Sequence, residues 1–287
     1  MKLVTFQAAD APPAPGVLRG ETVIGLGGAG FTNTIGVIGA GAEGRARIDR
    51  FVEEAPAQAR HAAAAVRMLA PVPRPGKLIC VGMNYRDHAA EIGAAIPTEP
   101  VIFNKFPSAI VGPGATVVLP KNVEKPDYEA ELAFVVGPGG RHIAAADWRK
   151  HVYGYLCLND VSARDWQIGR PGGQWLLGKT FDTFAPTGPW LTTADEIADP
   201  HNLAIQLSIG GETLQKSNTR NLIYGLPELI AYISSVVTLE PGDIVCTGTP
   251  GGVGMGRTPN RWLRPGEEMT VEIEGLGRLT NPVEAEE

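Results

Sequence analysis

The chain has 287 residues, of which 44% are hydrophobic and 20% charged, and its formal net charge is −6. Such a chain is long enough to bury a full core, and its composition is that of an ordinary globular protein. The net negative charge provides no basic field for phosphate backbones, so we expect no nucleic-acid partner.

The sequence gives no sign of a targeting or membrane segment. No basic and then apolar leader precedes the first strand, and no apolar stretch reaches the roughly 18 residues that a membrane helix needs. We therefore expect a cytoplasmic location and no membrane partner. Cys80, Cys157 and Cys246 lie far apart in apolar runs without a CxxC pair, which predicts buried reduced thiols.

The first part of the chain is predicted to be a small α+β module. From Ile48 to Leu69, apolar residues recur at helical spacing, with Pro56 placed to kink the helix. Residues 71–76 (PVPRPG) cannot continue a helix and predict a linker, so we divide the chain into residues 1–70 and 71–287. Before the helix, glycine and proline separate short predicted strands at Leu3–Phe6, Gly16–Leu18, Thr22–Leu26 and Thr34–Ile38.

The main domain, residues 71–287, is predicted to be rich in short strands. A strand at Lys77–Gly82 leads into a short helix at Asn84–Gly93, which ends at its glycine. Pro227 suits the first turn of a later amphipathic helix. Further strands are predicted at Val101–Asn104, Thr116–Leu119, Ala130–Val136, Tyr153–Asn159, Ala204–Ile209, Asp243–Thr247 and Met269–Ile273. Together these elements indicate an α+β, β-rich fold.

Two glycine patterns match GxGxxG, at residues 25–30 and 39–44. A dinucleotide site also needs a helix that opens at the loop and an acid that ends the next strand. The residues after Gly30 are not helical, and the strand that follows Gly44 ends at Gly82 without an acid. We therefore interpret both patterns as turns rather than as a cofactor site.

Carboxylates gather around two predicted strands. Glu129 and Glu131 lie two residues apart, so on a strand both project from the same face. Asp160 follows the strand Tyr153–Asn159, where an acid lies at the mouth of a site. The alternative for the glutamates is an exposed polar strand face. Buried together, the carboxylates would repel one another, and a hard cation, Mg²⁺ or Mn²⁺, would remove that cost.

Seven spaced elements occur in a fixed order along residues 77–283. They are VGMNYRDH at 81–88, EPVIF at 99–103, DYEAEL at 127–132, NDVSARD at 159–165, GKTFD at 178–182, GP at 188–189 and GDIVCTGTP at 242–250. With these elements the chain resembles the fumarylacetoacetate hydrolase family. The resemblance implies the mixed β-sandwich roll of that family, a divalent metal held by Glu129, Glu131 and Asp160, and a homodimer.

Three residues are candidates for catalysis. His88 and Glu91 stand three apart in a helical segment, so they share a face and Glu91 can orient the imidazole. They match the family's His–Glu dyad on a mobile lid, and the alternative is a solvated helix face. Lys179 lies in an apolar, glycine-bounded stretch, where a lysine can polarise a carbonyl or hold an oxyanion. A surface lysine is its alternative.

Four residues are candidates for substrate binding. Arg164 and Gln167 follow Asp160 by four and seven residues, so on a helix they line up with it and can bind a substrate carboxylate. Thr249 lies in a Gly/Pro-rich loop whose backbone amides can form an anion nest. Tyr85 is predicted to flank the pocket.

Within the family, the chain is similar to the branch that acts on 2-oxo acids. The loops at Gly172–Trp175 and Gly254–Gly256 look most like those of 2,4-didehydro-3-deoxy-rhamnonate hydrolases. The resemblance implies hydrolysis of a C–C bond in a 2,4-dioxo acid, with pyruvate leaving as an enolate. Alternatives are an oxaloacetate decarboxylase, a 2-oxo acid hydratase, isomerase or lyase with the same metal-enolate chemistry, and a metal-dependent binding protein without catalysis.

Overall fold

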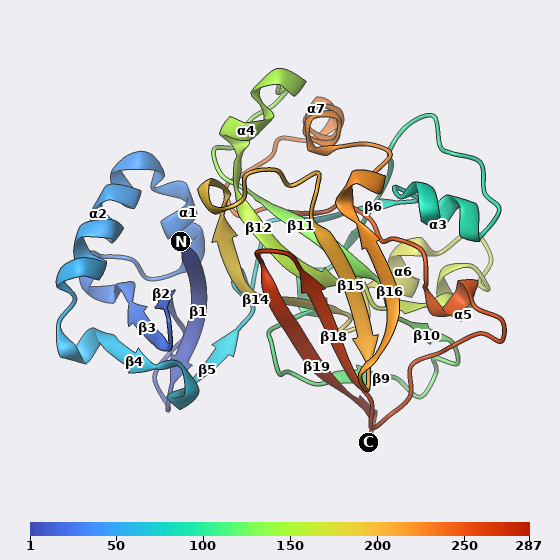
Figure 1. The fold of residues 1–287 in the computed structure, drawn as a ribbon, viewed down its shortest axis with the longest axis horizontal. Helices are drawn as coiled ribbons and strands as arrows, with labels where there is room; N and C mark the ends of the chain where they lie inside the picture. Colours follow the sequence, from blue (N-terminus) through green and yellow to red (C-terminus); the bar gives the residue numbers. More distant parts are fainter.

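The computed structural model describes all residues from Met1 to Glu287. Figure 1 shows the first strands and helices of the chain, coloured blue, beside a larger body that holds the C-terminus; we call this first part the N-terminal module. Strands predominate over helices, so the predicted α+β, β-rich class is confirmed. The structure holds no helix that is both long and apolar enough to cross a membrane.

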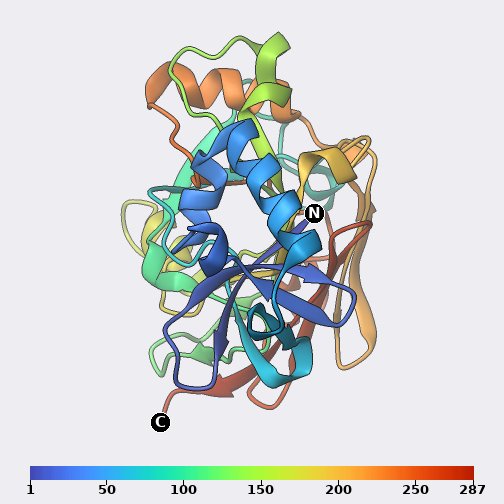
Figure 2. The ribbon, with the colours of Figure 1, turned by 90° about the vertical axis from the view of Figure 1, so that its left-hand side faces the viewer.

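The N-terminal module combines a small antiparallel sheet with two helices, and Figure 2 views it from its outer side. The helices are α1 (Thr34–Gly39) and α2 (Gly41–Glu54). The strands are β1 (Lys2–Ala8), β2 (Ala14–Arg19), β3 (Thr22–Gly25), β4 (Arg60–Ala62) and β5 (Val66–Leu69). β1 also pairs with a strand of the larger body. Because one sheet runs through both parts of the chain, the predicted division into residues 1–70 and 71–287 stays a prediction.

Three local predictions for this module are wrong. Residues 34–38 are helical rather than extended, because the Asn33 side chain accepts a hydrogen bond from the Gly36 N–H (2.8 Å) and caps α1. The predicted helix from Ile48 to Leu69 ends at Glu54, since Pro56 cannot continue it, and the later apolar residues lie in β4 and β5. The second glycine pattern, residues 39–44, joins α1 to α2 and forms the first turn of α2 rather than a loop turn.

Two sheets make up the larger body. The first continues from the N-terminal module in the order β4-β3-β2-β1-β14-β12-β11-β17-β6-β7, with β5 beside β1 and β8 beside β14. Its strands in the larger body are β6 (Leu78–Gly82), β7 (Val101–Lys105), β8 (Ile110–Val111), β11 (Ala130–Val136), β12 (Val152–Asn159), β14 (Ala185–Thr193) and β17 (Ile244–Cys246).

The second sheet packs against the first. It runs in the order β16-β15-β18-β19-β9, and a separate pair joins β10 to β13. The bounds are β9 (Val117–Leu119), β10 (Pro126–Asp127), β13 (Ser162–Ala163), β15 (Ala204–Ile209), β16 (Glu212–Asn218), β18 (Glu268–Ile273) and β19 (Gly277–Ala285). The strands β14, β16 and β19 were not predicted, because prolines, glycines and polar residues interrupt their apolar pattern.

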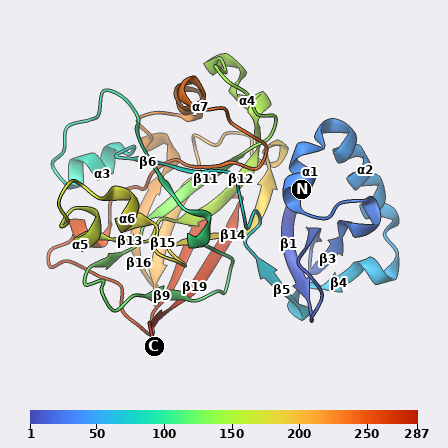
Figure 3. The same ribbon diagram turned by 180° about the vertical axis from the view of Figure 1, so that it is seen from behind.

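Five helices surround these sheets. Figure 3 shows α3, α5 and α6 grouped on one side of the body, away from the N-terminal module. The bounds are α3 (Arg86–Glu91), α4 (Trp148–His151), α5 (Arg164–Gln167), α6 (Trp175–Lys179) and α7 (Leu226–Val236). The predicted short helix is α3, with Gly93 in a left-handed conformation two residues beyond its end. The predicted late helix is α7, with Pro227 in its first turn.

The central strand β11 is buried on both faces. Its residues Ala130 and Leu132 belong to the core between the two sheets, whereas Ala133 and Val135 belong to the core shared with the N-terminal module. Glu131 lies two residues before Ala133, so it shares the face of β11 with Ala133 and Val135. Its side chain therefore points away from the second sheet. All three cysteines are buried and free, as predicted.

Candidate metal centre and active site

The pairing of β11 with β12 brings three carboxylates together. Ala130 lies opposite Asn159 in this antiparallel pair, so Glu129 and Glu131 approach Asp160 at the end of β12. The Asp160 N–H donates to the Glu129 carbonyl oxygen (2.9 Å), which fixes the two chain segments. One carboxylate oxygen of each residue lies within 4.8 Å of the others, and all three residues are buried.

This donor set fits a hard divalent cation. It offers only carboxylate oxygens, from two adjacent segments whose backbones are held together, and it leaves further coordination positions for water or substrate oxygens. Burying three carboxylates without compensating positive charge is costly. The residues Glu129, Glu131 and Asp160 therefore remain our proposed metal ligands.

Basic side chains already neutralise two of these carboxylates. Lys179 Nζ lies 2.6 Å from Glu129 Oε2 and 2.8 Å from Asp160 Oδ2, and Arg164 Nη2 lies 2.5 Å from Glu129 Oε1. Burial raises the pKa of Glu129, but Lys179 and Arg164 outweigh it and hold that pKa well below its usual range. Burial also lowers the pKa of Lys179, yet Asp160 and Glu129 raise it above its ordinary value, so Lys179 is an ammonium.

Glu131 is the carboxylate without a basic partner. Its Oε2 accepts the Gly248 N–H (2.8 Å), and no cationic side chain lies within 4.0 Å of it. Burial, followed by repulsion from Asp160 and Glu129, raises its pKa well above the ordinary value. Glu131 is therefore the ligand that gains most from a bound cation.

Sequence reasoning missed Lys105, whose buried Nζ bonds Asp160 Oδ1 and donates to the Val161 carbonyl oxygen (3.0 Å). The alternation of side chains along β7 could have identified Lys105 as a buried lysine. Ile102 and Asn104 are exposed, which places Lys105 on the inner face of the strand. A lysine at an inward position of a strand needs an acidic partner. Asp160 is that partner.

Replacing Lys105 with methionine is expected to lower the free energy of unfolding by about 3–5 kcal/mol, because it leaves a buried carboxylate without one of its two ammonium partners. Urea denaturation of the metal-free protein measures this loss. Lys216→Met, at an exposed lysine of β16, is the control. An equal, small loss in both variants would contradict the role of Lys105.

His88 and Glu91 form the predicted pair on α3. His88 Nδ1 lies 3.2 Å from Glu91 Oε2, and the Gly252 N–H donates to Glu91 Oε1 (2.8 Å). Burial raises the pKa of Glu91, but the hydrogen bonds to His88 and Gly252 outweigh it and leave that pKa below its usual value. Glu91 is thus a carboxylate at neutral pH that can orient the imidazole.

A cavity of about 170 Å³ joins these groups. Its polar lining consists of His88, Glu129, Glu131, Arg164, Gln167, Lys179 and Thr249. The remaining lining is Val81, Gly82, Met83, Ile92, Phe103, Ile168, Trp175 and Met255. A base, the carboxylates Glu129 and Glu131 and an ammonium therefore line one small cavity.

The predicted substrate-binding residues have different environments. Arg164 donates to Asp127, Glu129 and Gln167, so its guanidinium orients other side chains of the site. Gln167 is held by that contact and lines the cavity. The Thr249 hydroxyl donates to the Ala130 carbonyl oxygen (2.9 Å) and accepts from Gln215.

Tyr85 lies outside the cavity lining, in the core between the two sheets. Its buried hydroxyl has no hydrogen-bond partner. Burial, followed by the Glu131 charge, raises its pKa well above the ordinary value. A contact between Tyr85 and substrate therefore has no geometric support in this conformation.

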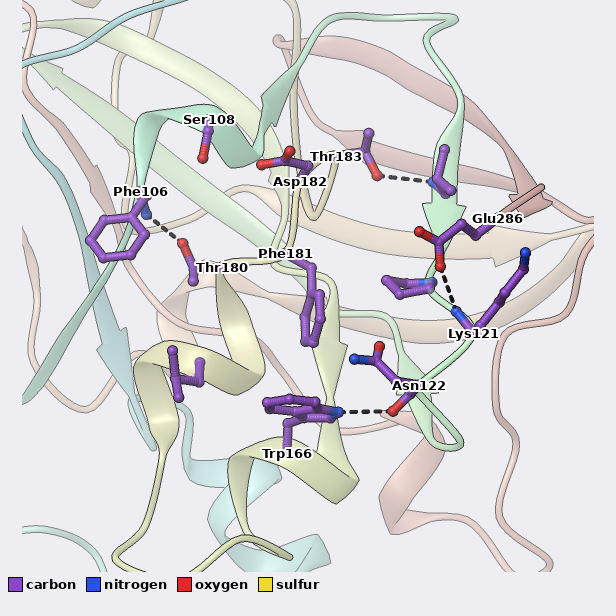
Figure 4. Close-up of a pocket in the computed structure, with 13 residues that line it drawn as sticks. Phe106, Ser108, Lys121, Asn122, Trp166, Thr180, Phe181, Asp182, Thr183 and Glu286 are labelled. Atoms are coloured by element: carbon purple, nitrogen blue, oxygen red, sulfur yellow. Dashed lines mark hydrogen bonds between the residues drawn. The ribbon is translucent and has the colours of Figure 1, made fainter.

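A second depression, of about 830 Å³, lies on the other side of α5 and α6. Figure 4 shows Phe106, Trp166 and Phe181 around it, with a hydrogen bond from the Trp166 indole N–H to Asn122. None of the predicted site residues lines it. It is larger than the 170 Å³ cavity but lacks the carboxylate cluster and the base, so we do not place the chemistry there.

Comparison with known proteins identifies close relatives. The family model described as fumarylacetoacetate hydrolase C-terminal matches residues 77–284. The mitochondrial oxaloacetate tautomerase FAHD2A of Bos taurus is 54% identical over 218 residues, which cover 76% of this chain and 69% of the bovine protein. The Homo sapiens FAHD2A protein is 53% identical with the same coverage.

Solved structures share the whole fold. Maleylpyruvate hydrolase from Sphingobium sp. SYK-6, solved with manganese(II) and pyruvate, is 32% identical with a TM-score of 0.83. Fumarylacetoacetate hydrolase from Exiguobacterium antarcticum is 34% identical with a TM-score of 0.87. Both alignments cover 100% of each chain. The manganese-bound relative, together with the acidic cluster described above, supports divalent-metal binding.

The expected cytoplasmic location is contradicted by these relatives, because the bovine and human proteins are named as mitochondrial. The expectation rested on hydropathy and charge alone.

The matched residues 77–284, the order of their motifs and the shared fold lead to one conclusion. The predicted mixed-sheet fold of the resemblance is confirmed by the same comparison. The chain belongs to the fumarylacetoacetate hydrolase family, whose members are enzymes with metal-dependent chemistry.

Proposed function

We propose that this protein is a metal-dependent enzyme that interconverts the keto and enol forms of a 2-oxo diacid, with oxaloacetate as the leading substrate. The observation that carries the proposal is the single cavity in which His88 faces the carboxylate cluster and the Lys179 ammonium. The names of the bovine and human relatives support the substrate.

Tautomerisation is the isomerase alternative that the sequence left open, and we propose it in place of C–C hydrolysis. Hydrolysis and enolisation share an enolate of a 2-oxo acid, so the same site residues serve either reaction. The bovine and human FAHD2A relatives, 54% and 53% identical, are named for tautomerisation, whereas the structure named for maleylpyruvate hydrolysis is 32% identical.

From keto to enol, C3 of the substrate loses a proton to His88 and the C2 oxygen takes a proton from solvent water. From enol to keto, protonated His88 returns a proton to C3 and the C2 oxygen releases its own. His88 accepts the C3 proton, while Glu91 holds the imidazole in place through the 3.2 Å contact to Nδ1. Lys179 has three N–H donors, of which two are directed to Glu129 and Asp160, and the third is available to the C2 oxygen.

A bound Mg²⁺ or Mn²⁺ would stabilise negative charge on the C2 oxygen and the C1 carboxylate. Glu129, Glu131 and Asp160 are the residues that would hold it. Gln167, whose Oε1 is fixed by Arg164 (2.8 Å), would donate its amide hydrogens to a substrate oxygen. The ion's identity depends on supply as well as on geometry.

The test follows the ultraviolet absorbance of enol-oxaloacetate with purified protein and Mg²⁺ or Mn²⁺, with chelator-treated protein as the control. Accelerated decay of the enol band without pyruvate release supports the proposal. Release of pyruvate from oxaloacetate would instead show decarboxylation. Binding of metal and oxaloacetate without any change in either signal would leave the non-catalytic binding protein as the function.

Hydrolysis of an acylpyruvate is the second candidate, because the manganese-bound structural relative is a maleylpyruvate hydrolase solved with pyruvate. The same protein incubated with acetylpyruvate tests it. Pyruvate and acetate in equal amounts, formed faster than oxaloacetate is enolised, would make hydrolysis the principal activity.

We also propose that the protein is a homodimer. The exposed apolar side chains Ile102, Phe106 and Val236 line one depression, and Phe106 and Leu177 line the next. Exposed apolar side chains that adjoin in this way are typical of an interface.

Phe106→Glu is therefore expected to give a monomer in light scattering after size-exclusion chromatography. The control is Ile96→Glu, at an exposed isoleucine outside both depressions, which should keep the wild-type mass. A monomeric wild-type protein would contradict the proposal.

A further inference from the structure

The loop after β17 contacts Glu91, the partner of His88 in the predicted catalytic pair, at the carboxylate oxygen that does not contact His88. Gly252 donates its N–H to Glu91 Oε1 (2.8 Å), so this carboxylate is held between the imidazole and the loop backbone. Gly252 has a φ of 101°, a conformation that favours glycine. A Cβ atom on Gly252 would also lie 2.3 Å from the Leu214 carbonyl oxygen, so a side chain has no room at this position.

Gly256 leaves the space that the Glu91 carboxylate fills. A Cβ atom built on Gly256 would lie 2.5 Å from Glu91 Cδ and 2.8 and 2.9 Å from its two oxygens. Real Cβ atoms do not approach so closely, so any side chain at this position displaces Glu91. The three nearest atoms all belong to the end of that flexible side chain, so the backbone has no reason to move.

The same loop is fastened to the carboxylate cluster. Asp127 Oδ1 accepts the Gly254 N–H (2.7 Å) and Asp127 Oδ2 accepts the Met255 N–H (3.0 Å). Arg164 Nε donates to Asp127 (2.8 Å), and its Nη2 donates to Glu129. A chain of charge-assisted hydrogen bonds thus runs from the loop to a proposed metal ligand.

We propose that Gly252 and Gly256 form a socket for the Glu91 carboxylate, and that Asp127 holds this socket at a fixed distance from the metal centre. The socket residues are positioning residues: they act on the substrate only through Glu91 and His88. The inference rests on the proposed function for its kinetic readout, but its structural readout does not depend on which reaction the enzyme performs.

The central variant is Gly256→Ala, compared with Gly251→Ala in the same loop. A Cβ atom on Gly251 would meet its nearest neighbours at 3.5–3.6 Å, which is ordinary van der Waals contact. With enol-oxaloacetate as substrate, Gly256→Ala is expected to lower kcat about tenfold, less than the roughly 10²–10⁴-fold loss for removal of the base itself, because His88 is still present. KM and the Kd for Mn²⁺ should change less than about twofold, because the metal ligands are not displaced. Gly251→Ala should match wild type.

Two further measurements separate a socket from a general structural role. In a double-mutant cycle, Gly256→Ala should cost nothing more in protein that already carries Glu91→Ala, because both changes remove the contact between residue 91 and His88. The imidazole NMR signal of His88, assigned by its loss in His88→Ala among the five histidines, should move in the same direction in Gly256→Ala and Glu91→Ala and stay in place in Gly251→Ala.

The outcomes are distinct. Additive losses in the cycle, an unmoved His88 signal in Gly256→Ala, or failure of that variant to fold would each overturn the socket. Wild-type protein that enolises no 2-oxo acid would overturn the proposed function alone, because the NMR comparison can still be made on it.

Discussion

Replacing Glu131 with glutamine is expected to abolish divalent-cation binding while leaving the metal-free protein folded. Glu131 is the one carboxylate of the cluster without a basic partner, and burial and its two acidic neighbours raise its pKa. The neutral amide removes an anionic ligand but relieves repulsion in the metal-free state. Calorimetric titration with Mn²⁺ and thermal unfolding with and without Mn²⁺ measure both effects.

The expected magnitude follows from linkage. At a Mn²⁺ concentration about 100 times its Kd, wild-type protein gains about 2.7 kcal/mol of stability from the ion. Glu131→Gln should gain none, and Glu212→Gln, at an exposed glutamate, should gain the wild-type amount. Equal Mn²⁺ affinity in Glu131→Gln and wild type would exclude Glu131 as a ligand.

The raised pKa of Glu131 also sets a pH dependence. Below that pKa the carboxylate holds a proton, which competes with the cation, so the affinity for Mn²⁺ should rise with pH until Glu131 is ionised. In the metal-free protein the sign is opposite: the folded state loses stability as pH rises through the raised pKa, because it then contains an uncompensated charge. The slope of affinity against pH should be reduced in Glu131→Gln.

The carboxylate cluster was accessible from sequence because it follows from strand geometry. Two glutamates at alternate positions must share a face, and an acid that ends the neighbouring strand meets them if the two strands pair. The pairing of Ala130 with Asn159 meets that condition. Local periodicity and one adjacent pairing were enough.

Other contacts depend on segments that are distant in sequence, and no local pattern encodes them. Gly252 reaches Glu91 across 161 positions, and Lys105 reaches Asp160 across 55. Arg164 was expected to bind substrate, but two carboxylates and an amide oxygen already accept from its guanidinium. Helical spacing correctly predicted that Arg164 lies beside the site. That Arg164 donates to Asp127 rather than to substrate follows from where the chain places Asp127, which no local pattern predicts.

Secondary structure was predicted well where apolar residues alternate, as in Ala204–Ile209, or form a continuous run, and poorly where a single capping contact decides. The strand Ala130–Val136 has the predicted bounds, since its apolar run is buried on both faces. Residues 34–38 have the apolar content of a strand, yet Asn33 caps them into a helix. β14 contains two prolines and a glycine, which hid a nine-residue strand of the central sheet.

Replacing His88 with alanine is expected to lower kcat by about 10²–10⁴-fold, the range for removal of a general base. His88 is the only imidazole that lines the cavity, and its Nδ1 is directed to Glu91, so the other ring nitrogen is available to the substrate. The Kd for Mn²⁺ should be unchanged, because His88 is not part of the carboxylate cluster.

The steady-state rate of enol-oxaloacetate decay, measured with Mg²⁺ at saturating substrate, checks this expectation. His61→Ala, at a histidine in the N-terminal module that packs on Phe6, is the control for loss of an imidazole elsewhere. Added imidazole should restore part of the rate in His88→Ala, because the substitution leaves a space beside Glu91 of the size of the missing ring. A variant that turned over substrate at the wild-type rate would show that C3 exchanges its proton with a group other than His88. Lys179, held as an ammonium by Glu129 and Asp160, could accept the C3 proton in the reverse direction only after losing its own.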